Sequence, residues 1–306
     1  MINVRIGTCS WADRQLLSSG WYPPSAKDGE SRLGHYSSCF DTVEVDSTFY
    51  AIPDITDVYR WASWTSPGFI FNVKAYGLFT FHSVQWTSLP RWVRDEIGLC
   101  EEKRIDFKKI PRSIRLELWH QFSESIMPLH KVGKLGYVLF QLPPWASFSD
   151  RMMVYLDRVV EEARPFKIAF EVRNSTWLDK GNRDVFFERL RGHNIAYVAV
   201  DEPSLPWTVP AVVEPTASWG SVVRFHGRNK EAWDRGSYVG EKFRYLYSRK
   251  ELEEWKEPVL GLAKKVDRLF LMFNNCWSDY SVRSASLMQD ITGQPRFGSQ
   301  GELDLR

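Results

Sequence analysis

Three short apolar runs of this chain carry pairs of polar residues that could do chemistry. In each run the two polar residues stand two positions apart, around one apolar residue: Glu44 and Asp46, Glu171 and Arg173, and Arg224 and His226. Side chains of a β-strand alternate between its two faces, so both members of a pair share a face. We expect the polar faces to meet in a common centre, while the apolar neighbours pack against helices.

Carboxylates and a histidine in one centre favour acid–base chemistry. We predict Glu44, Glu171 and His226 as the catalytic residues. Two carboxylates would also suit glycosidic chemistry, for which their separation decides the outcome. Two alternatives remain: Glu171 with an arginine forms a charge pair that only fixes the barrel, and His226 is a hydrogen-bonded core residue.

Several further side chains are predicted to bind a substrate. Basic residues bind carboxylate or phosphate groups, and amides and a tryptophan bind polar or flat groups. The predicted substrate-binding residues are Lys74, Arg173, Arg224, Arg228, Gln141, Asn274, Asn275, Trp11 and Asp46. Cys9 ends a predicted strand, but the sequence offers no base to activate it as a nucleophile.

The elements that must position these residues are eight runs rich in β-branched or aromatic residues. Segments long enough for helices separate them, and this alternation predicts an α/β fold, a (β/α)8 barrel of the TIM type, whose active site lies at the carboxyl ends of the strands. The predicted strands are Val4–Cys9, Thr42–Asp46, Phe69–Lys74, Gly136–Gln141, Lys167–Glu171, Ile195–Asp201, Ser221–His226 and Arg268–Asn274.

The 306 residues fit one such barrel with an insertion. We predict a single barrel domain over 1–290, an insertion of about 76–112 after the third strand, a regular helix over 114–130 and a polar C-terminal tail over 291–306. The insertion makes the barrel irregular and is placed to act as a lid. No apolar run is long enough to span a membrane, and the N-terminus does not resemble a signal peptide, so we expect a cytoplasmic protein.

Charge and composition restrict the partners. A net charge of +2 is too balanced for binding nucleic acid by charge alone. No C-x-x-C pair occurs among the four cysteines, which argues against a structural zinc site. Six histidines are too few for a multi-zinc centre, but a Mg²⁺ or Mn²⁺ ion on Glu44, Asp46 or Glu171 remains possible; the sequence requires no cofactor.

Several motifs together resemble one family over nearly the whole chain. They are Ile6–Trp11, Thr42–Tyr50, Phe71–Ala75, Leu139–Pro144, Ala169–Arg173 with Trp177, Arg224–Arg228 and Phe273–Asn275. They are similar to those of the YecE-like proteins, the domain-of-unknown-function 72 family. The resemblance implies a TIM barrel and supplies no activity. Cys9-Ser10 stands where that family usually has Ser-Gly, and Asp46 is often Asn there, so neither residue is implied to be essential.

Three functions remain open after this reasoning. The first is an enzyme with hydrolase- or isomerase-type acid–base chemistry on a small anionic or phosphorylated substrate. The second is a nucleic-acid-binding protein or metal-assisted phosphodiesterase, in which Trp11, Trp86 or Trp145 would stack on bases. The third is a non-catalytic ligand-binding protein. The sequence predicts neither the substrate nor the oligomeric state.

Overall fold

Parallel strands form a closed barrel in the computed structural model, which describes residues 4–98, 102–235 and 239–294. Around the barrel the strands follow one another in the order β1, β2, β3, β6, β7, β8, β9 and β10, and β10 pairs with β1. Their bounds are β1 (Val4–Thr8), β2 (Thr42–Val45), β3 (Ile70–Lys74), β6 (Leu135–Gln141), β7 (Ile168–Glu171), β8 (Ala196–Asp201), β9 (Ser221–Phe225) and β10 (Leu269–Phe273). The TIM-type barrel predicted from the sequence is therefore confirmed, and each predicted strand differs from the observed one by at most one residue at either end.

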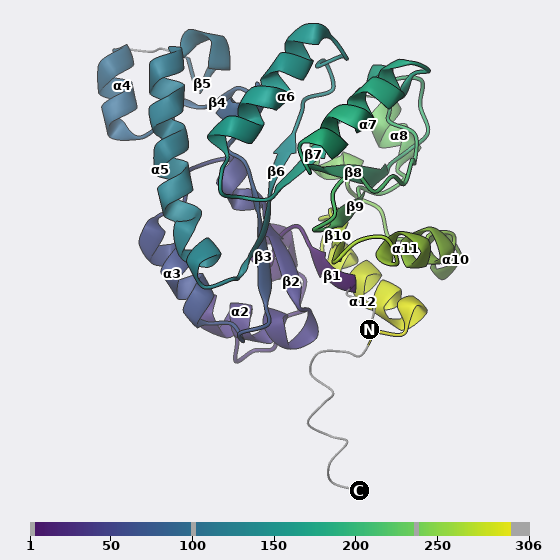
Figure 1. Cartoon of the computed structure of the whole chain (residues 1–306). Helices are drawn as coiled ribbons and strands as arrows, with labels where there is room; N and C mark the ends of the chain where they lie inside the picture. Colours follow the sequence, from purple (N-terminus) through teal and green to yellow (C-terminus); the bar gives the residue numbers. More distant parts are fainter. Residues whose placement is uncertain (1–3, 99–101, 236–238, 295–306) are drawn as a thin grey trace, which may run out of the picture.

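Helices surround the barrel, as Figure 1 shows. The outward side chains of the strands pack against them: the ring of Phe170 on β7 lies 6.2 Å from Phe186, and Phe225 on β9 lies 5.3 Å from Trp255. The helices are α1 (Arg14–Ser18), α2 (Gly29–Cys39), α3 (Ile55–Ser63), α5 (Arg112–Lys131), α6 (Asp150–Glu162), α7 (Asn182–Gly192), α8 (Lys230–Asp234), α9 (Val239–Lys242), α10 (Arg249–Glu253), α11 (Lys256–Ala263) and α12 (Tyr280–Thr292). Short 3-10 turns η1 (Asp46–Phe49) and η5 (Ser175–Leu178) follow β2 and β7.

The segment between β3 and α5 holds small elements in place of a single barrel helix. They are η2 (Gly77–Thr80), β4 (Val84–Gln85), η3 (Trp86–Ser88), α4 (Arg91–Ile97), β5 (Arg104–Ile105) and η4 (Phe107–Lys109). Helix α4 lies beside α5 (Figure 1), and Trp92 Nε1 donates to Gln121 Oε1 at 3.3 Å. Helix α5 extends two residues before and one residue after the predicted range of 114–130. The segment therefore adds to the barrel at the carboxyl end of β3.

The C-terminal part of the chain forms a longer helix than expected. Helix α12 continues to Thr292, and Ile291 is buried. The predicted tail of 291–306 therefore begins within the helix, because Ile291 continues the apolar face that includes Met288. Gly293, with φ of 68°, ends the helix in the left-handed conformation that glycine favours. Residues 295–306 lie outside the described part. Among the described helices, none is both long and apolar enough to cross a membrane.

Candidate functional site

Arg224 on β9 is the centre of a buried charge network at the carboxyl end of the barrel. Its Nη2 atom lies 2.7 Å from Oε1 of Glu44 on β2, and its Nη1 atom lies 2.6 Å from Oε2 of Glu171 on β7. All three side chains are fully buried. One guanidinium thus joins two carboxylates from strands well separated around the barrel. The alternation of side chains along the strands predicted this meeting.

A second arginine extends the network toward β8. Arg173 Nη1 lies 3.1 Å from Glu171 Oε1, and Nη2 lies 3.0 Å from Glu202 Oε2. The guanidinium of Arg173 also lies 5.1 Å from the ring of Trp233 on α8, close enough for a cation–π contact. Glu171 therefore accepts hydrogen bonds from two arginines at once.

His226 bridges the network to the end of β10. Its Nε2 lies 3.1 Å from Glu171 Oε1, and its Nδ1 lies 3.0 Å from Asn274 Nδ2. These partners assign the proton to Nε2, because Nδ1 must accept from the Asn274 amide. Burial, followed by the nearby charge of Arg173, lowers the pKa of His226 to about 3. The ring is therefore buried and neutral near pH 7, and both of its nitrogens already have hydrogen-bond partners.

The pKa values of Glu44 and Glu171 are shifted in opposite directions. Burial raises the pKa of Glu44, and the charge of Arg224 only partly opposes this effect. Burial acts in the same direction on Glu171, but Arg224 and His226 overcome it and hold its pKa well below the ordinary value. Tyr137 from β6 donates to Glu44 Oε2 at 3.1 Å. Two carboxyl groups with pKa values moved in opposite directions are typical of acid–base sites.

Asp46 and Lys74 lie at the solvent side of this network. Lys74 Nζ is 3.3 Å from Asp46 Oδ1 and 4.6 Å from the centre of the Phe49 ring. The same Asp46 oxygen lies 3.8 Å from Arg224 Nη2. The side chain of Asp46 is 22% exposed and that of Lys74 10% exposed, whereas Arg224 has no exposure. A molecule arriving from solvent therefore meets Asp46 and Lys74 before it meets the buried network.

We call Asp46, Lys74 and two more polar side chains, Gln141 and His82, the outer layer of the site. Gln141, at the end of β6, pairs in register with Glu171, and its Oε1 atom has no hydrogen-bond partner among the described residues. His82 follows η2, and its Nδ1 lies 2.9 Å from Thr80 Oγ1. Burial, followed by the charge of Lys74, lowers the pKa of His82 to about 4, so its ring is neutral near pH 7. Both side chains can serve as neutral hydrogen-bonding groups.

Arg228 is a predicted substrate ligand that the structure places elsewhere. It binds Asp201 through Nε and Nη2, and its Nη1 lies 2.8 Å from Glu254 Oε2. The reason is the backbone of Gly227, whose φ of 88° ends the strand alternation after His226. Arg228 therefore points to the outer helices, where Asp201 also accepts from Tyr247 and Trp255.

Asn275 and Trp11 are also separated from the central network. Asn275 Nδ2 donates to the Tyr245 carbonyl oxygen at 2.8 Å and to Ser284 Oγ at 3.1 Å, on the side of α12. Trp11 is buried, with its ring 5.5 Å from Trp61. Neither side chain is placed to touch a ligand of the outer layer.

Glu202 and Tyr137 take part in the network although neither was predicted. Tyr197 packs on the outer side of β8, 5.0 Å from Phe187, so positions 198, 200 and 202 face inward. Every second residue along β8 therefore faces inward, and this series leads to Glu202. Because both faces of the strand are apolar, the sequence alone did not show which series faces inward. Tyr137 shares its face of β6 with Gln141, and this alternation was the available signal.

Glu44, Glu171 and Cys9 all lie within reach of the Arg224 guanidinium. Within residues 4–98, 102–235 and 239–294, no three His, Cys, Asp or Glu side chains gather as metal ligands. Glu44 and Glu171 instead bind Arg224. Cys9 is buried, and Arg224 Nη2 lies 3.6 Å from its Sγ. Burial raises the pKa of Cys9 well above its usual value, which disfavours the nucleophilic thiolate.

Known proteins share this architecture and sequence. The chain is 30% identical over 277 residues to the UPF0759 protein YunF of Bacillus subtilis, covering 89% of this chain and 88% of the relative. A crystal structure of a DUF72 family protein from Thermotoga maritima has a TM-score of 0.75 and 27% identity, covering 95% of this chain and 99% of that one. A DUF72 family protein from Enterococcus faecalis has a TM-score of 0.77 and 23% identity over 95% of both chains. The family model described as "Protein of unknown function DUF72" matches residues 5–302, and the chain belongs to this family.

Proposed function

We propose that this chain is an enzyme that performs acid–base chemistry on a small hydroxyl-bearing substrate at the carboxyl end of the barrel. One observation carries the proposal: the partly exposed Asp46–Lys74 pair lies directly on the fully buried Arg224 network. Burying ion pairs is costly, and apolar residues of similar size often fill such a volume equally well. A rigid charged support beneath a solvent-accessible pair is instead what a preorganised active site requires.

We assign roles to four side chains at the carboxyl end of the barrel. Asp46 is the general base, because its Oδ1 atom makes only ion-pair contacts, at 3.3 Å and 3.8 Å, and no hydrogen bond to a described residue. Lys74 is the donor that returns a proton or stabilises a developing negative charge. Gln141 and Asn274 orient hydroxyl groups through their amides. Arg224 and Glu171 hold this layer in place and do not touch the substrate.

The charge balance favours a neutral substrate over the anionic one expected from the sequence. Four carboxylates, Glu44, Asp46, Glu171 and Glu202, surround three cations, Lys74, Arg173 and Arg224. The centre therefore does not contain more cations than carboxyl groups. Each cation already has a carboxylate partner, so a phosphate group would have to displace one.

A thermal-shift screen of wild type, Asp46→Asn and Lys74→Met tests this proposal. The panel contains neutral sugars and polyols, sugar phosphates, nucleotides, and intact and abasic oligonucleotides. Binding to the folded state raises the melting temperature, by the equivalent of about 2.7 kcal/mol at 100 times Kd. We expect a neutral hydroxyl-bearing compound to raise the wild-type midpoint and to have little effect on either variant.

Turnover is then followed by proton NMR with the compound that binds. We expect wild type to convert it and Asp46→Asn to leave it unchanged. Binding without conversion would refute the enzyme and identify a ligand-binding protein. A response to phosphorylated compounds or oligonucleotides alone would refute the substrate class, and a response that both variants retain, or no response at all, would refute the site.

A further inference from the structure

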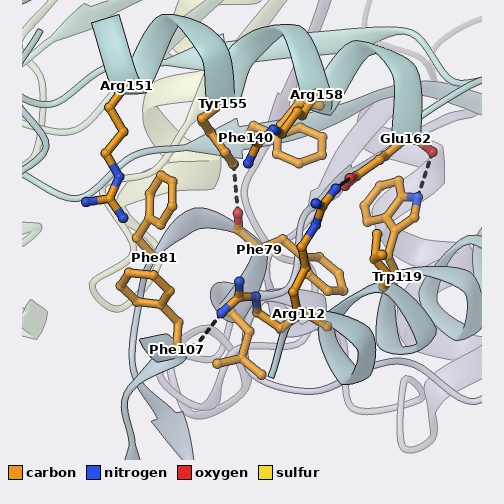
Figure 2. Close-up of a pocket in the computed structure, with 14 residues that line it drawn as sticks. Phe79, Phe81, Phe107, Arg112, Trp119, Phe140, Arg151, Tyr155, Arg158 and Glu162 are labelled. Carbon is orange, nitrogen blue, oxygen red and sulfur yellow. Dashed lines mark hydrogen bonds and ion pairs between the residues drawn. The ribbon is translucent and has the colours of Figure 1, made fainter. Parts of the chain in front are cut away.

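A cavity lies outside the barrel, between α5 and α6 (Figure 2). Its volume is about 190 Å³, and residues of η2 and η4 in the inserted segment also line it. The residues that line it are Leu78, Phe79, Phe81, Phe107, Arg112, Arg115, Leu116, Trp119, Phe140, Arg151, Tyr155, Arg158, Val159 and Glu162. None of them belongs to the outer layer at the barrel end.

Aromatic side chains whose polar atoms are already engaged form the floor of this cavity. Tyr155 donates its hydroxyl proton to the Phe79 carbonyl oxygen at 2.7 Å, and Trp119 Nε1 donates to the Glu162 carbonyl oxygen at 2.7 Å. The rings of Phe79 and Trp119 lie 5.1 Å apart, and those of Phe81 and Phe107 also 5.1 Å apart. The floor therefore offers ring edges and faces, and favours an apolar, flat group.

Arginines dominate the rim of the cavity. Arg112, Arg115, Arg151 and Arg158 oppose one carboxylate, Glu162, which gives the lining a net charge of 4 − 1 = +3. Arg112 lies 3.9 Å from Glu162, and Arg115 donates to two backbone carbonyl oxygens at 2.9 Å. Arg151 and Arg158 have no ion-pair partner within the described ranges, and both are exposed. Figure 2 shows the Arg151 side chain extending along the cavity toward Phe81.

The size of the cavity limits what can occupy it. An apolar cavity of about 150 Å³ holds one benzene molecule, whereas pockets for drug-sized ligands begin at about 300 Å³. A volume of about 190 Å³ therefore suits a single ring whose charged substituent reaches the rim. We propose that this pocket binds a small molecule in which one aromatic ring carries a phosphate or carboxylate group, with the ring on the Phe79–Trp119 floor and the anion on the arginine rim.

Isothermal titration calorimetry with four probes tests the proposal: phenyl phosphate, 3-phenylpropionate, benzyl alcohol and inorganic phosphate. We expect one or both aromatic anions to bind, and the neutral ring and the free phosphate to bind at least about tenfold more weakly, since each lacks half of the contacts. Comparing the first two probes tells a phosphate ligand from a carboxylate ligand. Equal binding of inorganic phosphate, or no binding of either aromatic anion, would overturn the proposal.

Variants locate the bound probe. Arg151→Gln and Arg158→Gln should each weaken binding about tenfold, as expected for the loss of a charge-assisted hydrogen bond at a partly exposed site. Leu116→Trp should fill the cavity and abolish binding, while its circular dichroism spectrum stays that of wild type. Arg249→Gln, an exposed arginine on α10, is the matched charge control and should leave the affinity unchanged.

Asp46→Asn separates this pocket from the site at the barrel end. Because it lies outside the lining of the pocket, we expect it to leave the affinity for the aromatic anion unchanged. If Asp46→Asn weakens the binding while Arg151→Gln and Arg158→Gln do not, the anion occupies the barrel end and the second site is refuted.

Discussion

Replacing Arg224 by methionine should destabilise the protein strongly, because Glu44 and Glu171 would stay buried without their shared positive partner. Arg224 contacts them at 2.7 Å and 2.6 Å, and none of the three side chains is exposed. Removing one partner of a buried ion pair costs about 3–5 kcal/mol. We therefore expect Arg224→Met to lower the free energy of unfolding by about 4 kcal/mol near pH 7.

The size of this loss should depend on pH. In wild type the pKa of Glu171 is lowered, so its contribution is present above the unfolded pKa and is lost as pH falls through the folded pKa. Without Arg224, burial raises the pKa of Glu44 further, while Glu171 keeps Arg173 as its partner. The stability contribution of Glu44 is then full below the unfolded pKa and is lost as pH rises through the folded pKa. The loss in free energy of unfolding that Arg224→Met causes should therefore be smaller at pH 5 than at pH 7. It should decrease by about 1.4 kcal/mol for each pH unit over which the folded variant binds one proton more than its unfolded state.

Urea unfolding at pH 5 and pH 7, followed by circular dichroism and tryptophan fluorescence, measures both effects. Arg224→Lys keeps a charge but cannot contact both carboxylates, and it should lose about half as much, which provides a measurement if the methionine variant does not fold. Arg60→Met removes an exposed arginine paired with Asp57 and should change stability by less than about 1 kcal/mol. A loss below about 1 kcal/mol for Arg224→Met, or a deficit that grows toward pH 5, would refute this reasoning.

Four further substitutions test other positions. Gly7→Ala should prevent folding, measured as loss of soluble protein, because a Cβ atom would lie 2.0 Å from the Thr42 carbonyl oxygen. Gly34→Ala is its control: helix α2 has free space at this position, and thermal unfolding should show a gain in stability of up to about 1 kcal/mol. Asp201→Asn keeps the shape but loses the charge that accepts from an arginine, a tyrosine and a tryptophan, and urea unfolding should show a loss of about 2–3 kcal/mol. Lys134→Met should lower the melting temperature, because its ammonium group donates to three oxygen atoms near the end of α3, each within 2.9 Å; an unchanged midpoint would show that these bonds contribute nothing.

Much of the barrel was predictable because each strand is short and its pattern is local. The pairs of polar residues in β2, β7 and β9 also fixed which side faces inward, and so brought Glu44, Glu171 and Arg224 together correctly. Prediction failed where the strand geometry ends. Arg228 follows a glycine with positive φ, which reverses the direction of its side chain.

The functional state of the side chains was less accessible to sequence reasoning. His226 lies in the expected place, but its two hydrogen-bond partners and its burial, which decide that it is neutral, come from distant strands. The ion pair of Arg173 with Glu202 was not predicted, because the two residues follow different strands and no local pattern joins them. The cavity between α5 and α6 depends on the packing of helices and the inserted segment, which no local pattern describes.

Closure of the barrel between β1 and β10 has a consequence for synthesis on the ribosome. The first strand of the barrel pairs with its last strand, and Glu44 pairs with Arg224, which lies 180 residues further along the chain. Until β9 and β10 have emerged from the exit tunnel, the nascent half-barrel has two open edges, and its acidic interior positions lack the arginine that makes their burial tolerable. We therefore expect the barrel to fold stably only after β9 and β10 have been synthesised, and we expect chains that end before β9 to aggregate.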